Sequence, residues 1–529
     1  MEKNAIILAA GKSKNFAPFT YEKPKGLFKI KNEVLIERQI EQLLEANVKE
    51  IILVVGHMKE KYFYLQEKYN VKLLSNNKFD KIGNLCSLYE AKEYLGNTFV
   101  CAVDNYFVEN PFIDNNEDNL SYRACTYQSG GFKDFGIEYN DENVITDVHV
   151  GGKDMNIMTG HAYFNDKFSK KIKELMEEEI LDFRVDNLYW EEFYLKHIKK
   201  LNLKAKLYES NSIVEFDDIE DLCKFDIEFF NNLDSQIIKN IVNTIKCEPN
   251  EVEDIKVINA GLTNISFSFC VGNIYYVYRH PGSTSGNLIN RETEIVAQNL
   301  AKEVGVDKSL IHIDDDGWKL SYLITDLVKF DIQDTDEILT RSISYIKRIH
   351  NSKYSDNVKV FDNVKEGLKL IDIASLTKGN LSLEFKDLID KVKKLYELSE
   401  NDTYTKSVKK VLCHNDTYTP NYLLDKNDEL YLIDWEYAGV NYPINDIACI
   451  ICRGYYNQEE VDRMLRIFYE RELTKDERRH AITYITLCGF YWFSWGLYKG
   501  SVGDDDSFFF LPAYTTLVKY IDVALDCYK

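Results

Sequence analysis

The first 230 residues alternate short apolar runs with amphipathic segments, a rhythm that few folds can accommodate. Apolar runs at 5–9, 51–55 and 99–103 have the length of buried strands, and residues 35–46 carry their apolar side chains on one helical face. Strands and helices in this order favour an α/β fold, with a parallel sheet covered by helices on both faces. Ligands of such sheets bind beyond the carboxyl ends of the strands.

The second half of the chain follows a different pattern, and we predict two domains, 1–230 and 235–529. Residues 255–278 indicate antiparallel strands with tight turns, whereas most of the chain after Asp336 indicates helices. The exception is a strand–turn–strand unit at 411–435. A small sheet lobe followed by a helical lobe is the order of elements in a two-lobed, protein-kinase-like α+β fold.

The composition excludes several classes of protein. Apolar residues make up 45% and charged residues 29% of the 529 residues, which fits ordinary globular domains. The net charge of −21 argues against nucleic acid or an anionic membrane as the main partner. The eleven cysteines are scattered, with Cys449 and Cys452 closest together, so we expect free thiols rather than disulfides or a zinc site.

Two apolar stretches resemble membrane signals. Residues 481–498 carry no charge over 18 positions, near the lower limit for a membrane-spanning helix. Thr, Ser, Gly and Tyr interrupt this run, which favours a buried helix instead. The run at 5–10 is shorter than the core of a signal peptide, about 7–15 residues. We therefore expect a cytoplasmic protein without a membrane span.

The segment 411–439 contains a constellation suited to phosphoryl transfer. His414, Asp416 and Asn421 form the pattern H-x-D-x-x-x-x-N, and Asp434 follows Asn421 by thirteen residues. Phosphoryl transfer needs a carboxylate at the acceptor hydroxyl and oxygen ligands for Mg²⁺. We expect Asp416 to orient the hydroxyl, and Asn421 and Asp434 to hold the metal.

This segment resembles the choline/ethanolamine kinase branch of the aminoglycoside-phosphotransferase-like superfamily, and the resemblance covers about 257–528. It implies ATP as the phosphate donor, Asp416 as the catalytic base and a metal site at Asn421 and Asp434. It also implies that Glu436, followed by Tyr437 in I-D-W-E-Y, lies where metal and substrate meet. A polar hairpin whose Asp and Asn only form turns would be the alternative.

Upstream segments agree with the resemblance. Residues 259–264 resemble the loop that covers the nucleotide phosphates, and Arg279, in a segment resembling R-x-P-G, would be the phosphate-binding cation. Glu294, or else Glu292, would pair with Arg279. The segment 324–328 resembles the hinge that receives adenine through backbone groups; its central residues are Thr325 and Asp326.

The acceptor pocket is expected on a late helix that begins with a capping box formed by Thr474 and Glu477. A quaternary ammonium is served by aromatic faces, at about 0.5–2 kcal/mol each. The helix carries an aromatic group, and Asp446 could add an acidic partner; the aromatic residues are Tyr491, Trp492, Trp495 and Tyr498. An ordinary aromatic core helix would have the same pattern.

The start of the chain, AIILAAGKSKNFAPFTYEKPKGLFKI, resembles nucleotidyltransferases that carry an L-A-A-G-x-G-x-R loop and a P-K motif. The segment resembles the CTP:phosphocholine cytidylyltransferase type, whose domain has a Rossmann-like fold, and the resemblance extends to about Phe229. It implies a triphosphate site on the backbone of Ala10, Gly11 and Lys12. Lys25 would neutralise the phosphates and take part in catalysis.

The same resemblance implies three further groups of site residues. Asn84 and Ser87 would contact the nucleotide, and Asp104 and Asp217 would bind Mg²⁺. The choline end of the substrate would lie against an aromatic and acidic group consisting of Tyr189, Trp190 and Glu191.

The loop departs from the family pattern at two positions. Ser13 stands where the second glycine is expected, and Asn15 stands where the arginine is expected. Loss of a cation at such a centre can lower the rate by orders of magnitude. Lys12 or Lys14 could supply the charge, although a lysine is a point charge and not a bidentate fork.

These observations predict a bifunctional enzyme that phosphorylates choline with ATP and converts phosphocholine and CTP to CDP-choline and pyrophosphate. Two alternatives remain open at the level of sequence. The substrate could be ethanolamine or another amino alcohol. The N-terminal half could also be a catalytically silent nucleotide-binding module, because Asn15 replaces the arginine.

Overall fold

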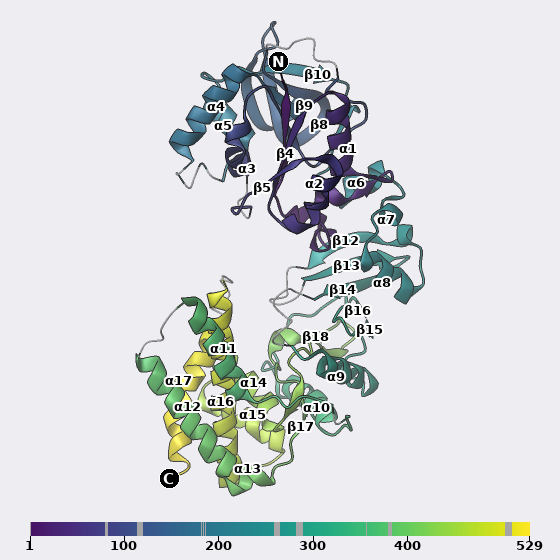
Figure 1. Cartoon of the computed structure of the whole chain (residues 1–529). Helices are drawn as coiled ribbons and strands as arrows, with labels where there is room; N and C mark the ends of the chain where they lie inside the picture. Colours follow the sequence, from purple (N-terminus) through teal and green to yellow (C-terminus); the bar gives the residue numbers. More distant parts are fainter. Residues whose placement is uncertain are drawn as a thin grey trace. The chain divides into compact units, whose positions relative to one another are not determined.

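The structure, a computed structural model, consists of two compact units, Met1–Val252 and Glu253–Lys529 (Figure 1). The residues that the structure describes are 2–79, 83–113, 120–180, 182, 185, 187–258, 265–281, 289–355, 357–378, 383–502 and 510–529.

Residues 235–252, which the sequence pattern assigned to the second domain, have their contacts with the first unit. The reason is visible at Glu22, whose carboxylate accepts hydrogen bonds from Oγ of Ser235 at 2.5 Å and from the backbone N–H of Ile237 at 3.0 Å. These bonds fix the start of α8 (Gln236–Ile245) on the N-terminal unit.

A seven-stranded sheet, in the order β10–β8–β9–β6–β1–β4–β5, forms the centre of the first unit. β1 pairs in parallel with both β4 and β6, and β4 pairs in parallel with β5, as predicted. β9, however, is antiparallel to β6 and β8, so the sheet is mixed and not wholly parallel. The strands are β1 (Asn4–Ala9), β4 (Glu50–Val55), β5 (Lys72–Ser75), β6 (Thr98–Ala102), β8 (Tyr122–Tyr139), β9 (Ile145–Phe164) and β10 (Lys204–Tyr208).

Helices cover both faces of this sheet. Alternate side chains of β1 enter different cores: Ile6 and Leu8 belong to one, Ala5 and Ile7 to the other. This alternation is the pleat of a strand that is buried on both faces. The helices are α1 (Leu35–Glu45), α2 (Tyr64–Tyr69), α3 (Leu85–Glu90), α4 (Asp166–Glu179), α5 (Trp190–Lys196), α6 (Ile219–Phe225) and α7 (Phe229–Asn232).

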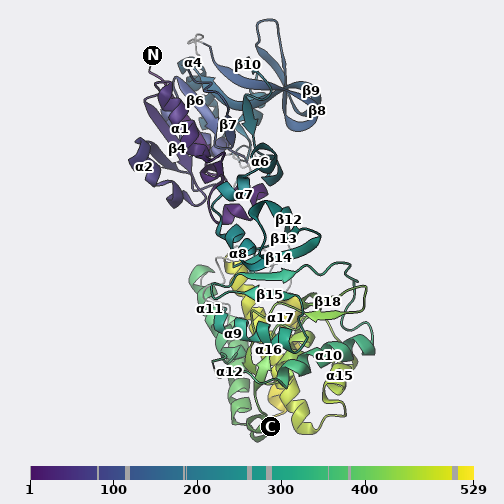
Figure 2. The same cartoon turned by 90° about the vertical axis from the view of Figure 1, so that its right-hand side faces the viewer.

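The long twisted hairpin of β8 and β9 (Figure 2) was not expected from the sequence. Two short ladders complete the unit: β2 (Lys29–Ile30) with β3 (Glu33–Val34), and β7 (Asn105–Phe107) with β11 (Ile213–Glu215). The second ladder brings together the segments that carry Asp104 and Asp217, since the backbone N–H of Phe216 donates to the carbonyl of Asp104 at 3.4 Å.

The second unit begins with a five-stranded antiparallel sheet in the order β12–β13–β14–β16–β15, as expected for the small lobe. Two further short antiparallel pairs follow, β17 with β20 and β18 with β19. The strands are β12 (Glu253–Ile258), β13 (Ile265–Val271), β14 (Ile274–His280), β15 (Leu310–Ile313), β16 (Lys319–Tyr322), β17 (Val411–Cys413), β18 (Tyr422–Leu424), β19 (Leu430–Leu432) and β20 (Gly439–Asn441).

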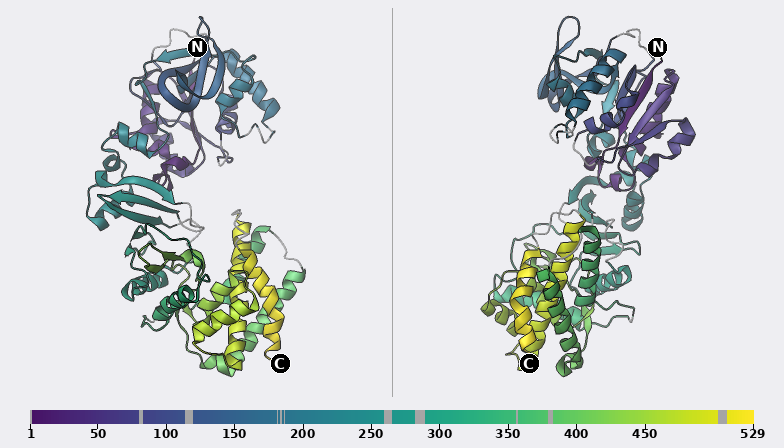
Figure 3. Two further views of the ribbon diagram at one scale, coloured as in Figure 1. Left: turned by 180° about the vertical axis from the view of Figure 1, so that it is seen from behind. Right: turned by 60° about the vertical axis from the view of Figure 1, so that its left-hand side comes forward.

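A helical lobe follows, in which the buried helix α16 packs against α11, α14 and α17 (Figure 3, green and yellow). The capping box of α16 is confirmed: Thr474 and Glu477 bond to each other's backbone N–H groups. The helices are α9 (Arg291–Glu303), α10 (Asp336–His350), α11 (Asn363–Lys378), α12 (Leu383–Asn401), α13 (Thr403–Ser407), α14 (Ile444–Cys452), α15 (Gln458–Tyr469), α16 (Lys475–Ser501) and α17 (Leu511–Asp526).

The buried helix predicted at 481–498 lies inside α16. Among the residues that the structure describes, no helix has both the length and the apolar character needed to cross a membrane. All eleven cysteines are free thiols.

Gly160 of β9 allows the β7–β11 ladder to approach the main sheet. Its φ of +76° lies in the left-handed region, and a Cβ atom there would lie 2.9 Å from Cγ2 of Ile213 and 3.2 Å from Cε1 of Phe107. We predict that Gly160→Ala lowers the free energy of unfolding of the first unit by about 2–4 kcal/mol, through backbone strain and overpacking.

Denaturation of the full chain followed by calorimetry measures this effect. Gly131→Ala is the matched control, because its nearest atom, the carbonyl oxygen of Gly152, would lie 3.9 Å from the new Cβ. Equal stability of the two variants would contradict the prediction.

Candidate active sites

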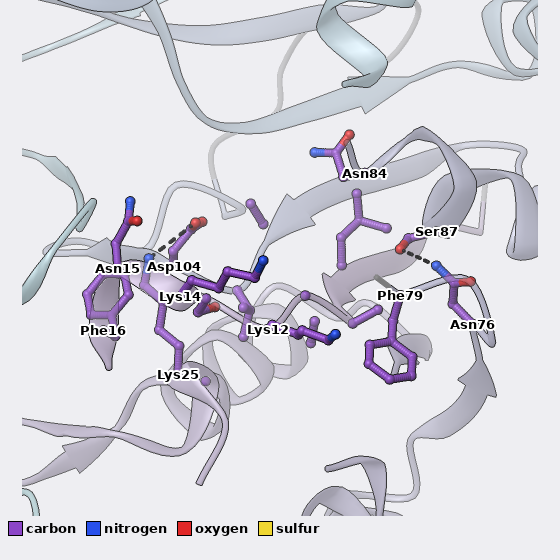
Figure 4. Close-up of a pocket in the computed structure, with 18 of the residues that line it drawn as sticks. Lys12, Lys14, Asn15, Phe16, Lys25, Asn76, Phe79, Asn84, Ser87 and Asp104 are labelled. Carbon is purple, nitrogen blue, oxygen red and sulfur yellow. Dashed lines mark hydrogen bonds and ion pairs between the residues drawn. The ribbon is translucent and has the colours of Figure 1, made fainter. Parts of the chain in front are cut away.

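A cavity of about 530 Å³ lies in the first unit at the carboxyl ends of β1 and β6 (Figure 4). Most of the residues predicted for the nucleotidyltransferase site line it: Ala10, Gly11, Lys12, Lys25, Asn84, Ser87, Asp104, Tyr189 and Asp217. The position agrees with the rule that ligands bind beyond the carboxyl ends of parallel strands.

The loop after β1 forms one wall of this cavity. The carbonyl of Ala10 accepts the backbone N–H of His57 at 2.9 Å, which fixes the start of the loop. Ser13 has a φ of +48°, so the position expected to be glycine keeps a left-handed conformation. Lys14 and Asn15 both line the cavity, and Asn15 therefore leaves a neutral side chain where an arginine is expected.

Lys25 and Asp104 form an ion pair at the cavity wall. Nζ of Lys25 lies 3.3 Å from Oδ2 of Asp104 and also donates to the carbonyl of Phe216. The Lys25 side chain is only 5% exposed, and its Nζ lies 4.0 Å from the centre of the Phe16 ring. The cation is thus held rigidly beside a carboxylate that faces the cavity.

Asn84 and Ser87 belong to the start of α3. Oδ1 of Asn84 accepts the backbone N–H of Trp190 at 2.9 Å, and Oγ of Ser87 accepts Nδ2 of Asn76 at 3.0 Å (Figure 4). Asn76 and Phe79 also line the cavity and were not predicted. Asn76 directly follows β5, so the carboxyl-end rule could have identified it.

Of the three residues predicted to bind the choline end in this unit, one lies at the cavity. Tyr189 lines the cavity, but Trp190 and Glu191 do not. Trp190 is 3% exposed and packs in the hydrophobic core, 5.4 Å from the Phe164 ring. Glu191 is buried and paired with Arg123 at 3.2 Å. Because Tyr189 is the N-cap of α5, the next two residues turn away into the helix and the core.

A second cavity, of about 440 Å³, lies in the second unit. The predicted residues that line it are Arg279, Asp416, Asn421, Asp434, Glu436, Tyr437, Trp492 and Trp495. They come from the small sheet, from the segment between β17 and β20 and from α16. The fold thus brings together eight of the side chains that sequence reasoning selected.

The H-x-D-x-x-x-x-N segment is held by its own hydrogen bonds. Nδ1 of His414 accepts the backbone N–H of Asp416 at 3.2 Å, and its Nε2 donates to the carbonyl of Ile433 at 2.9 Å. Burial lowers the pKa of His414, which favours this neutral tautomer. Nδ2 of Asn421 donates to Oδ2 of Asp416 at 3.1 Å, so the oxygen end of the amide is the one suited to a cation.

Asp416 is a buried carboxylate with raised basicity. Burial raises its pKa well above the ordinary value, although the nearby Arg453 opposes this shift. A carboxylate in this environment accepts a proton more readily than one exposed to water.

Arg279 lies between two carboxylates. Its Nη2 donates to Glu294, and its Nη1 donates to Glu436 at 3.0 Å. Of the two candidate partners in α9, Glu294 is therefore the one that pairs with Arg279. Burial disfavours the charge on Glu294, but Arg279 and Arg291 outweigh it and hold the pKa of that carboxyl below its usual value.

Asp446 does not line the cavity, which corrects the prediction that it contacts the acceptor. Its carboxylate accepts the backbone N–H of His414 at 3.2 Å and of Asn415 at 2.7 Å, and it pairs with Nε2 of His350 at 2.8 Å. Burying a carboxylate is costly unless it has partners, and the partners of Asp446 include the backbone of the loop that precedes Asp416. Asp446 therefore holds the segment that carries Asp416.

The predicted hinge segment reaches the cavity with some of its residues, but not with its two central side chains. Ile324 and Leu327 line the cavity, whereas Thr325 and Asp326 do not. Oδ1 of Asp326 pairs with Nζ of Lys426 at 2.9 Å on the surface. The predicted phosphate-covering loop, 259–264, lies outside the described residues.

The aromatic wall also differs from the prediction. Trp492 and Trp495 line the cavity, while Tyr491 and Tyr498 are buried in the core of the lobe. Tyr418 and Phe510, which the sequence analysis did not select, take their place in the lining.

Two cations in this cavity were not predicted. Lys319, on β16, lines it beside Arg279, and Arg453 lines it beside Asp416. Nη1 of Arg453 lies 3.1 Å from Oδ1 of Asp416. Lys319 lies on a short strand and Arg453 at the end of an apolar helix, and neither belongs to a sequence motif that indicates phosphate chemistry.

Comparison with known proteins gives separate matches for the two halves. The family model for MobA-like NTP transferase domains matches residues 5–131, and the model for choline/ethanolamine kinases matches residues 255–487. Among curated proteins, a choline-phosphate cytidylyltransferase of Streptococcus pneumoniae is 34% identical over 222 residues, which cover 42% of this chain and 96% of that protein.

Two further curated relatives are similar to parts of the chain. A 2-aminoethylphosphonate cytidylyltransferase of Lancefieldella rimae is 31% identical over 226 residues, covering 42% of this chain and 92% of the relative. Protein LicA of Haemophilus influenzae is 29% identical over 212 residues, covering 39% of this chain and 76% of the relative.

Solved structures match each half as well. The CTP:phosphocholine cytidylyltransferase of Streptococcus pneumoniae is 33% identical with a TM-score of 0.41, and it covers 42% of this chain and 97% of its own. The choline kinase LicA of the same organism is 22% identical with a TM-score of 0.46, and it covers 54% of this chain and 98% of its own.

The role of Asp446 can be tested by Asp446→Asn. The amide would present an N–H₂ group to at least one backbone donor, so we predict a loss of about 1–3 kcal/mol in stability and a fall of about tenfold to a hundredfold in phosphoryl transfer. Steady-state rates and urea denaturation measure both effects. Asp315→Asn, an exposed carboxylate of the same unit, is the control, and equal rates for the two variants would contradict the prediction.

Proposed function

Because this chain belongs to the choline-phosphate cytidylyltransferase family and also carries a choline/ethanolamine kinase domain, we propose that it converts choline to CDP-choline in two steps. The second unit phosphorylates choline with ATP. The first unit then joins the phosphocholine to CTP and releases pyrophosphate. The observation that carries the proposal is that one chain contains two cavities, each lined by carboxylates and by cations suited to phosphate.

In the kinase step, Asp416 accepts the proton of the choline hydroxyl as the hydroxyl oxygen attacks the γ-phosphorus of ATP. The bond from this phosphorus to the β,γ-bridging oxygen breaks, and ADP leaves. This role is supported by its burial and by the orientation that His414 and Asn421 impose. Arg279, oriented by Glu294, neutralises charge on the ATP phosphates. Adenine would lie against the segment of Ile324 and Leu327.

In the cytidylyl step, an oxygen of the phosphocholine phosphate attacks the α-phosphorus of CTP. The backbone of Ala10, Gly11 and Lys12 and the cation of Lys25 would bind the triphosphate, with Asn84 and Ser87 at the nucleoside. The ring of Tyr189 would receive the trimethylammonium group.

Lys14 is the side chain that we propose in place of the missing loop arginine. It lines the same cavity as Asn15 and precedes it directly in the chain. A lysine provides the charge but not the bidentate geometry of a guanidinium, so the cytidylyl step retains its electrostatic component.

Mg²⁺ is the metal that suits both donor sets. The amide oxygen of Asn421 with the carboxylate of Asp434, and the carboxylates of Asp104 and Asp217, are hard oxygen ligands at cavity walls. When bound, Mg²⁺ would neutralise charge on the phosphate oxygens. Since ATP and CTP are cytoplasmic nucleotides, we place both reactions in the cytoplasm.

Separate substitutions in the two cavities test the proposal. We predict that Asp434→Ala lowers ATP-dependent phosphorylation of choline by at least about a hundredfold and leaves pyrophosphate release from CTP and phosphocholine unchanged. Asp104→Ala should have the reverse effect. A coupled assay of the full chain, which follows every nucleotide product, measures both activities.

The same assay separates the alternatives. Phosphorylation of ethanolamine without phosphorylation of choline would replace the acceptor. Absence of pyrophosphate release from the unsubstituted protein would leave the first unit as a nucleotide-binding module only. Loss of both activities in either variant would contradict the assignment of the kinase step to the second unit and the cytidylyl step to the first.

A further inference from the structure

The acceptor end of the kinase cavity already contains a cation, the guanidinium of Arg453. Its carbon Cζ lies 4.2 Å from the centre of the Trp492 ring and 4.0 Å from that of Tyr418. The ring of Phe510 lies at 5.4 Å. Three aromatic faces thus surround one positively charged group, which is the arrangement that a quaternary ammonium ligand requires.

Arg453 is also bound to the carboxylate proposed as the base. Nη1 lies 3.1 Å from Oδ1 of Asp416, and the two side chains are 5% and 9% exposed. The pair is therefore almost completely shielded from water. The attraction between opposite charges is stronger in such an environment than in water. The same guanidinium thus contacts both the aromatic faces and the proposed base.

Choline carries no hydrogen-bond donor on its charged end. It therefore depends on the ring faces that Arg453 now covers, and its charge is repelled by a guanidinium at the same site. The ammonium of ethanolamine depends less on these faces, because its N–H groups can be satisfied by carboxylate or carbonyl oxygens.

We propose that Arg453 is a specificity-determining residue that competes with the acceptor for the aromatic site. Binding of choline displaces the guanidinium from Trp492 and Tyr418 and frees Asp416 for the acceptor hydroxyl. The competition weakens the affinity for choline more than that for ethanolamine. This inference rests on the proposed kinase function of the second unit.

Arg453→Gln in the full chain tests the competition, because glutamine keeps a polar side chain but removes the charge and the planar cation. We expect the KM for choline to fall about tenfold or more, the KM for ethanolamine to fall less, and the KM for ATP to stay within about twofold. A merely structural role would change kcat or stability without lowering the KM for choline. Titration with choline, followed by tryptophan fluorescence, measures binding directly because Trp492 forms the wall.

Arg466→Gln, a more exposed arginine of the same unit, is the matched control and should leave every KM unchanged. If Arg453→Gln does not fold at the assay temperature, Arg453→Lys carries the test. Lysine keeps a charge for Asp416 but lacks the flat guanidinium, so the KM for choline should fall by a smaller factor.

An unchanged or higher KM for choline in the folded variant would overturn the inference. Failure of the unsubstituted enzyme to phosphorylate either amino alcohol would instead contradict the proposed function. The two results differ, because the first is a comparison between two active enzymes and the second concerns the unsubstituted enzyme alone.

Discussion

A charged side chain that leaves water must find a partner, and this requirement determines the position of the polar groups in both cavities. Lys25 is fixed by Asp104, and Arg279 is fixed by Glu294 and Glu436. In each case the buried cation is held in one orientation by its carboxylate partner. The cavities are therefore preorganised by ion pairs whose members face both the protein and the site.

The same requirement extends to the backbone through Asp446. Its carboxylate accepts hydrogen bonds from two backbone N–H groups of one short loop. These bonds offset the cost of burying the charge, and they also fix the loop. The loop in turn orients His414 and Asp416. The position of the proposed base Asp416 thus depends on Asp446, a residue of α14 whose side chain does not line the cavity.

Much of this arrangement could be predicted from the sequence. Strands with a clear apolar run, such as 5–9 and 51–55, were predicted correctly because burial on both faces leaves a strong pattern. The long strand β9 was not predicted, since its exposed part alternates polar and small residues without an apolar run. Motif residues such as Asp416 and Asn421 lie together because the short β17–β19 segment carries them all.

Site predictions were less reliable for residues that were selected because they are adjacent in sequence to a motif residue. Trp190 follows Tyr189 in sequence but begins a helix, where consecutive side chains point in different directions. Arg453 was not selected because its role depends on rings from three distant segments, those of Tyr418, Trp492 and Phe510. Contacts between segments that are far apart in the chain produce no recognisable spacing pattern in the sequence.

The left-handed backbone at Ser13 has a consequence for the triphosphate site that we propose in the first unit. Glycine at this position would adopt the conformation without strain but would have many other conformations available to it. Serine pays about 1 kcal/mol for the left-handed state but has fewer alternatives to lose. At the proposed triphosphate site, this loop therefore loses less conformational entropy on binding than a loop with glycine at this position would.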